Sequence, residues 1–296
     1  MYIPEKLNKG DKIAIISPAG SVNPEFVKSA SNLINSYQFQ AIVFPSCLKK
    51  NFQFAGKDED RLQDLQKALD DENIKAILCS RGGYGIIRIL NKLNFEKFLE
   101  KPKWIIGFSD ITNLHLALNK YNVMSIHGLM TKAMHEVPET VAVKNIFKIL
   151  EGEKTKIICQ SHKLNKKGEV EAEIIGGNLS IIYSLQATDF EIDTDNKILF
   201  IEDLNEYLYH LDRMMLSLKL AKKFDKLKAL IVGSFSDMKD NQNAFGKTAY
   251  EIIAEHIAEF DFPVCFNFPL GHINNNMPIV CGQKYKLEIA DKVSLY

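Results

Sequence analysis

The sequence has no long hydrophobic run and no excess of charge of either sign. Its apolar stretches, such as Ile198–Ile201, are far shorter than the roughly 20 residues that a membrane-spanning helix needs. Lysine and arginine together number 37, as do aspartate and glutamate, so the formal net charge is zero. A neutral chain is a poor partner for nucleic acid or for an anionic membrane surface. We therefore expect neither as a partner.

Metal-binding and disulfide motifs are also absent. The five cysteines are odd in number, contain no C-x-x-C pair and mostly lie in apolar, strand-like segments, which is typical of reduced core thiols. No H-E-x-x-H motif or Cys/His cluster is present, which argues against a zinc hydrolase. The first residues, MYIPEKLNKGDK, lack the apolar segment of a secretory signal. These features predict a cytoplasmic protein with no metal and no cofactor.

The composition that remains is that of an ordinary globular protein. Hydrophobic residues make up 46% of the 296 residues and charged residues 25%, and this length is sufficient for two domains. In the first half, apolar runs alternate with segments of helical spacing; the runs are 13–16, 41–44, 76–79 and 104–106. This alternation predicts a parallel, Rossmann-like sheet with helices on both faces and a ligand site at the carboxyl ends of its strands.

The second half of the chain has a different pattern. Polar, turn-rich segments between residues 151 and 168 interrupt the alternation. We therefore predict an N-terminal α/β domain over 1–150, a linker over 151–168 and a smaller, barrel-like C-terminal domain of mixed α/β structure over 169–296. Within the last of these, an amphipathic helix is expected over 206–220, and another is expected to run from about residue 180 through Ala187.

The most informative segment is Trp104–Leu114, with the sequence WIIGFSDITNL. A buried strand leads through Gly107 to Ser109, and apolar residues at helical spacing follow. A serine at such a junction is exposed above the sheet, with the N–H of the next residue, Asp110, directed at the group that the hydroxyl attacks. Ile111 stands where the G-x-S-x-G motif has its second glycine. The alternative is a structural role, since serine is a favoured helix N-cap and aspartate suits a first turn.

The loop Ser80–Gly85, with the sequence SRGGYG, is the second informative segment. Three glycines beside a helix start allow backbone N–H groups to approach an anion. Three interpretations of the loop are open. It binds a phosphate group, it supplies the second oxyanion donor opposite Asp110, or it is a plain tight turn. A phosphate cradle is disfavoured because the third glycine of a dinucleotide motif and the Lys-Ser/Thr of a P-loop are missing.

A nucleophilic serine needs a base, and the base usually needs an orienting carboxylate. Of the seven histidines, His127 and His272 lie at strand exits beside glycine, where functional loops are often built. Glu202, at the end of the apolar run Ile198–Ile201, is the best candidate for the carboxylate. The alternative for Glu202 is an ordinary surface or capping residue.

A series of motifs now points to a family. The segments SRGGYG, IIGFSDIT, HG, GGNLS, LFIED, DRM and PLGH occur in this order along nearly the whole chain. Together they resemble the LD-carboxypeptidase family of serine peptidases. The resemblance implies that Ser109 is the nucleophile, His272 the base and Glu202 the orienting carboxylate. The chain departs from the pattern at Leu129, where relatives often have proline after the glycine.

The same resemblance implies further properties. The oxyanion hole would be formed by the N–H groups of Gly83 and Asp110, in a cleft between the two domains of a protein that commonly forms homodimers. The expected substrates are peptidoglycan stem peptides (muropeptides): terminal D-alanine would be released from the tetrapeptide in the cytoplasm, during cell-wall recycling.

Recognition of a terminal carboxylate requires a cation or free N–H donors close to the scissile bond. Arg81 lies on the loop that carries the proposed oxyanion donor and is therefore the candidate. The alternative is that Arg81 pairs with a neighbouring acid such as Asp110.

Two other functions compete with this prediction. Some relatives cleave an amide bond in a peptide–nucleotide antibiotic, although those chains tend to be longer. In a different class, the N-terminal domain would be a non-catalytic nucleotide-binding module that uses the glycine-rich loop. The missing third glycine and the missing P-loop lysine argue against the latter.

Overall fold

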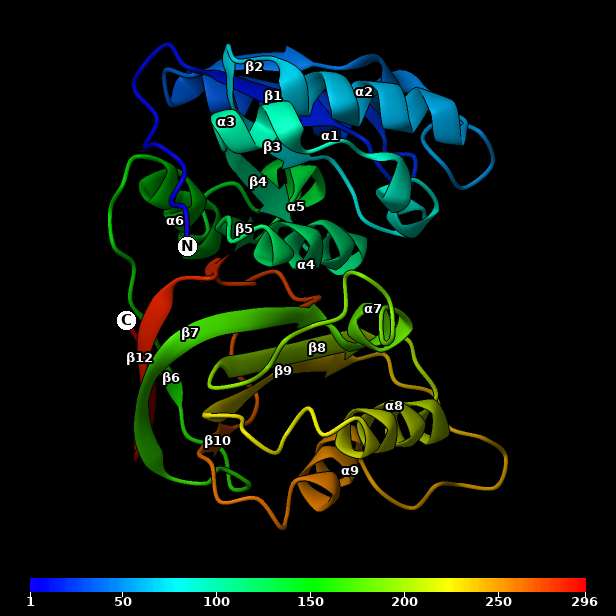
Figure 1. Cartoon of the computed structure of the whole chain (residues 1–296), viewed down its shortest axis with the longest axis vertical. Helices are drawn as coiled ribbons and strands as arrows, with labels where there is room; N and C mark the ends of the chain where they lie inside the picture. The colour runs from blue at the N-terminus through cyan, green and yellow to red at the C-terminus, as the bar shows by residue number, and fades with distance from the viewer. The chain divides into compact units, whose positions relative to one another are not determined.

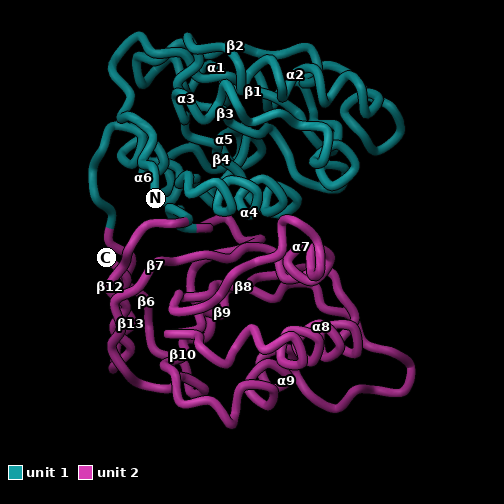
Figure 2. Tube along the Cα trace, in the orientation of Figure 1, with its two compact units in different colours: residues 1–155, 277–281 teal, residues 156–276, 282–296 magenta.

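The computed structural model describes residues 1–296 and divides into two compact units. Unit 1 comprises residues 1–155 and 277–281, and unit 2 comprises 156–276 and 282–296 (Figure 2). Unit 1 contains a largely parallel sheet with helices, and the smaller unit 2 contains a mixed sheet with helices. The predicted fold class is confirmed.

The sheet of unit 1 has the strand order β11-β5-β4-β3-β1-β2. The strands are β1 (Lys12–Ile16), β2 (Gln40–Val43), β3 (Ile74–Cys79), β4 (Trp104–Gly107), β5 (Ser125–His127) and β11 (Ile279–Cys281). All neighbours are parallel except β11, which runs antiparallel to β5. Because the central strands are covered on both faces, they are continuously apolar rather than alternating.

Helices cover this sheet, as Figure 1 shows. They are α1 (Pro24–Ser36), α2 (Asp58–Asp70), α3 (Glu96–Glu100), α4 (Thr112–Lys120), α5 (Thr131–Glu136) and α6 (Val141–Leu150). Asparagine followed by proline predicts a helix start, with asparagine as the N-cap and proline as the first helical residue. Helix α1 has this start: Pro24 is its first residue, and the Asn23 side chain accepts a hydrogen bond from the Glu25 N–H at 3.0 Å.

The direction of the strand order reverses at β1, because β2 and β3 lie on opposite sides of it. Right-handed crossovers then place α1 and α2 on opposite faces of the sheet. The loops that follow β1 and β3 therefore diverge at a topological switch point, which is where open α/β sheets bind ligands.

Unit 2 is built on a seven-stranded sheet of order β10-β9-β8-β7-β12-β13-β6. Its strands are β6 (Ile157–Gln160), β7 (Gly168–Asn178), β8 (Ile198–Leu204), β9 (Ala229–Ser236), β10 (Val264–Cys265), β12 (Lys284–Ile289) and β13 (Lys292–Leu295). Strand β7 is long and curved (Figure 1). Its first half pairs antiparallel with β12 and its second half pairs parallel with β8.

Three helices belong to this unit: α7 (Leu179–Ser184), α8 (Leu208–Leu220) and α9 (Ala249–His256). The helix predicted to extend through Ala187 ends at Ser184, and Ala187 itself has a φ of 60°. This left-handed conformation is incompatible with continuation of a right-handed helix. The helix predicted over 206–220 begins two positions later, at Leu208.

The predicted domain boundaries differ from these units in two places. Ile157–Gln160, in the predicted linker, is strand β6 of unit 2 and pairs with β13. Residues 277–281, in the predicted C-terminal domain, belong to unit 1 because β11 pairs with β5. Both differences arise from strand pairings between residues distant in sequence, which cannot be predicted from local polarity and turn content.

No helix of the structure has the length and apolar character needed to cross a membrane.

Candidate active site

Ser109 follows β4 after one intervening residue, at the start of a short 3-10 turn, η4 (Ser109–Ile111), that leads into α4. Its φ of 64° is in the left-handed region, which costs a non-glycine residue on the order of 1 kcal/mol and is typical of a strained functional turn. Phe108, not Ser109, is the N-cap residue of the turn, and Ile111 is that of α4. The capping role considered for Ser109 is therefore wrong.

Glycines allow two segments to approach this turn closely. A Cβ atom on Gly82 would lie 2.9 Å from Ser109 Cβ and 3.2 Å from the Asp110 nitrogen, so the backbone of the glycine-rich loop packs against the serine. A Cβ atom on Gly107 would lie 2.7 Å from Cγ1 of Ile111. Ile111, at the position of the second glycine of G-x-S-x-G, thus packs over the first one. Gly82 was not assigned a role from the sequence.

The Asp110 side chain is buried and connects the turn to the end of the glycine-rich loop. Its Oδ2 accepts a hydrogen bond from the Ile86 N–H at 2.9 Å, and its Oδ1 accepts one from Asn113 Nδ2 at 3.1 Å. Burial raises the pKa of Asp110 to about 6, although the Ile86 N–H and the charge of Arg61 oppose this rise. Arg81 donates instead to the carbonyl oxygen of Ser21 at 2.6 Å, so the alternative pairing of Arg81 with Asp110 is wrong.

Glu202 lies near the end of β8, where the register with β9 shifts between Ile201 and Asp203. Such a bulge re-aims a side chain at the end of a strand. Glu202 is 0% exposed, and its Oε2 accepts a hydrogen bond from Nδ1 of His272 at 2.6 Å. Its Oε1 has no hydrogen-bond partner. The imidazole is therefore the principal partner of a fully buried carboxylate.

The electrostatics of this pair favour the protonated imidazole. Burial by itself lowers the pKa of His272, but the hydrogen bond to Glu202, the charge of Glu202 and the charge of Asp203 outweigh it. The pKa of His272 is consequently raised above its ordinary value of 6.5. A carboxylate at Nδ1 holds the proton on that nitrogen, so the basic lone pair is on Nε2.

Backbone hydrogen bonds hold the residues just before His272 in place. Gly271 has a φ of 111°, and a Cβ atom there would lie 2.8 Å from Cβ of Glu202. The Gly271 N–H donates to Oδ1 of the buried Asn276 at 2.8 Å, and the Ser234 N–H of β9 donates to the Leu270 carbonyl at 2.8 Å. Only glycine combines this conformation with such a close approach. Three consecutive asparagines, residues 274–276, follow His272 closely and predict a turn that holds the imidazole; that Asn276 is the one that accepts this bond is not marked in the sequence.

Asp203, the second carboxylate at the end of β8, has a different environment. Its Oδ2 accepts from the Ser180 N–H and its Oδ1 from Asn178 Nδ2, each at 2.9 Å, so it fixes the start of α7. Burial and then the charge of Glu202 raise the pKa of Asp203 to about 7. The two adjacent carboxylates therefore have separate partners: Glu202 bonds to His272, and Asp203 bonds to the start of α7.

The other histidine candidates have structural environments. His127 is buried within β5, opposite Ile279 of β11. In α4, His115 contacts Ser125 Oγ at 2.8 Å through Nδ1 and the Gly107 carbonyl at 2.9 Å through Nε2. Burial lowers the pKa of His115 to about 4, so its ring is neutral. His115 therefore holds the Gly107 end of β4 by a hydrogen bond to its carbonyl.

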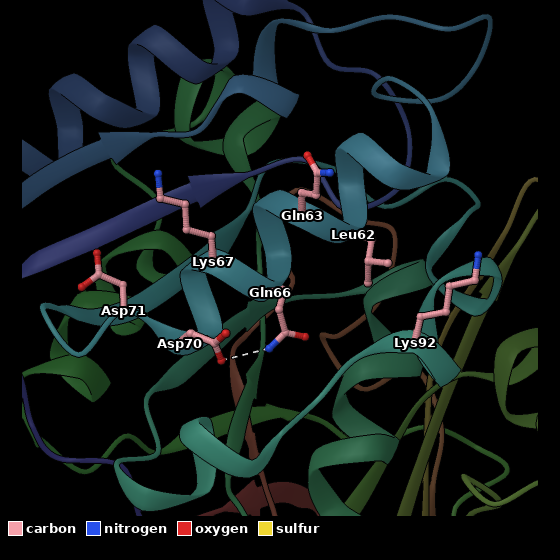
Figure 3. Close-up of a pocket in the computed structure, with 7 residues that line it drawn as sticks. All are labelled: Leu62, Gln63, Gln66, Lys67, Asp70, Asp71 and Lys92. Carbon is pink, nitrogen blue, oxygen red and sulfur yellow. Dashed lines mark hydrogen bonds between the residues drawn. The ribbon is translucent and has the colours of Figure 1, made fainter.

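Unit 1 has several surface pockets, two of which border the glycine-rich loop or α2. One, of about 480 Å³, is lined by Val22, Asn23, Phe26, Ser80, Arg81, Lys132 and Glu136. The other, of about 650 Å³, lies on α2 and includes Leu62, Gln66 and Lys92 (Figure 3). Only the first contains a predicted site residue, Arg81. No group of three or more His, Cys, Asp or Glu side chains in the structure is arranged to hold a metal ion.

Comparison with known proteins decides the family. Residues 13–128 match the LD-carboxypeptidase N-terminal domain, and residues 171–287 match the LD-carboxypeptidase C-terminal domain. The chain belongs to the LD-carboxypeptidase family. The enzyme class predicted from the sequence, a serine carboxypeptidase, is thereby confirmed.

Similar proteins include a probable murein peptide carboxypeptidase of Bacillus subtilis, which is 30% identical over 99% of this chain and 94% of the relative. A murein tetrapeptide carboxypeptidase of Pseudomonas aeruginosa is 27% identical, covering 94% of this chain and 93% of the relative. The crystal structure of muramoyltetrapeptide carboxypeptidase from Oxalobacter formigenes superimposes with a TM-score of 0.87 at 28% identity, covering 96% of this chain and 97% of that one. The microcin C7 self-immunity protein of Escherichia coli is 25% identical over 82% of this chain and 80% of the relative.

Proposed function

We propose that this LD-carboxypeptidase releases terminal D-alanine from peptidoglycan-derived tetrapeptides through a triad of Ser109, His272 and Glu202. The observation that carries the proposal is the 2.6 Å hydrogen bond between Nδ1 of His272 and the fully buried Glu202. A buried carboxylate at Nδ1 orients an imidazole as a general base through Nε2. The strained turn at Ser109 supplies the matching nucleophile.

In this mechanism, Nε2 of His272 accepts the proton of the Ser109 hydroxyl as Oγ attacks the peptide carbonyl. The imidazolium that forms is stabilised by Glu202, and it then protonates the nitrogen of departing D-alanine. Nε2 of His272 then takes a proton from water, which attacks the acyl-enzyme. As the bond to Oγ breaks, Nε2 returns this proton to Oγ and restores Ser109. Each step uses one proton, which passes through Nε2.

The negative oxygen of the tetrahedral intermediate would be bound by the N–H groups of Gly83 and Asp110. The Gly82 carbonyl accepts a hydrogen bond from the Gly20 N–H at 3.0 Å. Across a trans peptide bond, the Gly83 N–H points opposite to that carbonyl, and therefore away from the Gly20 nitrogen. With Gly82 packed against Ser109, this orientation supports a donor role for Gly83.

We further propose that the enzyme is a cytoplasmic homodimer that acts in peptidoglycan recycling. Five unpaired cysteines, four of them buried, are compatible with a reducing compartment. The names of the relatives refer to murein peptides. Cell fractionation tests the location, and light scattering of the purified protein tests the dimer.

The similarity to the microcin C7 self-immunity protein gives a second candidate, an amidase that cleaves a peptide–nucleotide conjugate. Mass spectrometry distinguishes the two candidates when the purified enzyme is incubated separately with a muropeptide mixture and with a peptide–nucleotide amide. Loss of one alanine from tetrapeptides supports the carboxypeptidase. Cleavage of the conjugate alone supports the amidase.

Amidation of the terminal carboxylate should abolish cleavage of the tetrapeptide. Arg81, beside Ser80 in the 480 Å³ pocket, is placed at the start of the loop that packs against Ser109, and a guanidinium recognises a carboxylate by charge-assisted hydrogen bonds. The products from free-acid and amidated tetrapeptides are compared by mass. Equal cleavage of both would show that the terminal charge is not read.

Hydrolysis should continue after prolonged dialysis against EDTA, because no cluster of potential metal ligands is present in the structure and the proposed steps need only side chains and backbone N–H groups. The rate of D-alanine release before and after dialysis is the measurement. Inactivation by EDTA, reversed by zinc, would require a different mechanism.

A further inference from the structure

Arg61, on the inner face of α2, is a fully buried cation. Its Nη1 donates to the carbonyl oxygens of Pro18 at 2.8 Å and Gly85 at 2.9 Å. Its Nη2 forms an ion pair with Asp58, which is itself partly exposed. Burial of a charged group is strongly unfavourable unless hydrogen bonds and an opposite charge compensate for it. The hydrogen bonds to Pro18 and Gly85 indicate that Arg61 holds the backbone at these two residues in place.

The two carbonyls belong to the two loops at the topological switch point. Pro18 follows β1, and Gly85 ends the glycine-rich loop that follows β3. The loops are also joined by the hydrogen bond from the Gly20 N–H to the Gly82 carbonyl. One residue beyond Gly85, the Ile86 N–H donates to the Asp110 carboxylate of the nucleophile turn. The end of the glycine-rich loop is thus held by two charged side chains: Arg61 bonds to the Gly85 carbonyl, and Asp110 bonds to the Ile86 N–H.

Gly85 is matched to this arrangement. A Cβ atom there would lie 2.5 Å from Nη1 of Arg61, and the residue has a φ of 142°. Both its conformation and the approach of the guanidinium therefore require glycine. Gly85, the last glycine of SRGGYG, leaves space for the Arg61 guanidinium. This contact explains why a glycine is needed at position 85, two residues beyond the proposed oxyanion donor Gly83.

We propose that Arg61 is a positioning residue for the oxyanion hole. Its guanidinium holds the glycine-rich loop so that the Gly83 N–H stays aligned with the oxygen of the tetrahedral intermediate. Lysine cannot replace it, because a single ammonium lacks the planar fork that serves Pro18, Gly85 and Asp58 together. This inference rests on the proposed function, since it assumes that the loop binds the oxyanion.

Lys103 provides a matched control. It is also a buried cation of unit 1, and its Nζ donates to the backbone carbonyls of Ala68 at 3.1 Å and Asp71 at 2.6 Å. Those carbonyls lie at the C-terminal end of α2, and neither belongs to the glycine-rich loop. Removal of Arg61 takes a donor from the carbonyls of Pro18 and Gly85, and removal of Lys103 takes one from those of Ala68 and Asp71. Only the bonds of Arg61 reach the loop that carries the proposed oxyanion donor.

The experiment compares Arg61→Lys, Arg61→Met and Lys103→Met with the parent enzyme. Displacement of a catalytic group by about 1 Å, or loss of one oxyanion donor, lowers kcat roughly 100-fold. We expect a decrease of this size for both Arg61 variants, with KM changed less than about threefold, because the donor acts mainly in the transition state. Labelling of the active-site serine by a fluorophosphonate should slow in parallel. Lys103→Met should lose thermal stability but keep kcat.

The inference is overturned if folded Arg61→Lys has the parental kcat and labelling rate. It is also overturned if its losses are no larger than those of Lys103→Met. Arg61→Lys retains the buried charge, so it remains informative if Arg61→Met fails to fold. A Ser109→Ala variant, assayed in the same experiment, distinguishes failure of the Arg61 inference from failure of the proposed function. Persistent activity in Ser109→Ala refutes the triad, whereas an inactive Ser109→Ala with normal Arg61 variants refutes only the role of Arg61.

Discussion

Ser109→Ala should abolish tetrapeptide hydrolysis without unfolding the protein. Loss of a triad nucleophile typically lowers kcat by about 10⁶-fold, and what remains comes from binding and the oxyanion hole. The fold should persist because alanine has the same backbone constraints as serine at this φ of 64°, and because the turn is held by Asp110 and the packing of Ile111 on Gly107. Chromatographic assay of released D-alanine, together with thermal unfolding, measures both effects.

Ser29→Ala is the control for this experiment. Ser29 is in the same unit, and its Oγ contacts Nδ1 of His135 at 2.8 Å, so it is a serine hydrogen-bonded to a histidine outside the proposed triad. It lies on α1 and not at a strand-to-helix turn. This variant should retain parental activity. A folded Ser109→Ala enzyme with near-parental turnover would remove Ser109 as the nucleophile.

Glu202→Gln should lower kcat by about 10⁴-fold with a much smaller change in KM. An amide at this position no longer fixes the required tautomer of His272 or stabilises its cation, and both effects matter most in the transition state. The pH dependence gives a second readout. Because the base must be neutral, parental activity is lost as the pH falls through the raised pKa of His272.

The variant should shift this pH dependence in a defined direction. Glu202 supplies the hydrogen bond and the first of the charges that raise the pKa of His272, while burial lowers it. Without the carboxylate the pKa falls, so the acidic limb of the kcat/KM profile moves to lower pH. Unchanged kcat with an increased KM, or an unmoved acidic limb, would instead make Glu202 a substrate-binding residue.

Unit 2 offers a matched control. Oε2 of Glu206 accepts from Nδ1 of His210 at 2.6 Å, the same donor, acceptor and distance as in the Glu202–His272 pair. The Glu206 pair is partly exposed at the start of α8, where Glu206 precedes the helix and His210 lies in its first turn, whereas Glu202 is fully buried at a strand end. Glu206→Gln should therefore leave kcat and the pH profile unchanged. A loss equal to that of Glu202→Gln would show that the effect is not specific to the proposed triad.

Much of this protein follows from local sequence. The apolar runs predict the positions of β1, β3 and β4, and the Asn23-Pro24 pair marks the first residue of α1. These features are local because burial periodicity and capping involve residues a few positions apart. The ordered motifs also predicted the family, which the matches to both domains confirmed. The strand-to-helix junction around Ser109 is local in the same sense.

Other features depend on tertiary structure alone. His272 and Glu202 are 70 residues apart in the chain, and the Gly271–Asn276 bond that anchors the histidine depends on the conformation of a whole loop. Arg61 is one of several charged residues at the start of an amphipathic helix, and nothing in its neighbours marks it as buried. Strand β11 joins unit 1 only through its pairing with β5. Whether a residue is buried, and which distant residue it hydrogen-bonds to, depends on how the whole chain folds. The sequence therefore predicted candidate catalytic residues. The residues that hold them in position were determined only by the tertiary structure.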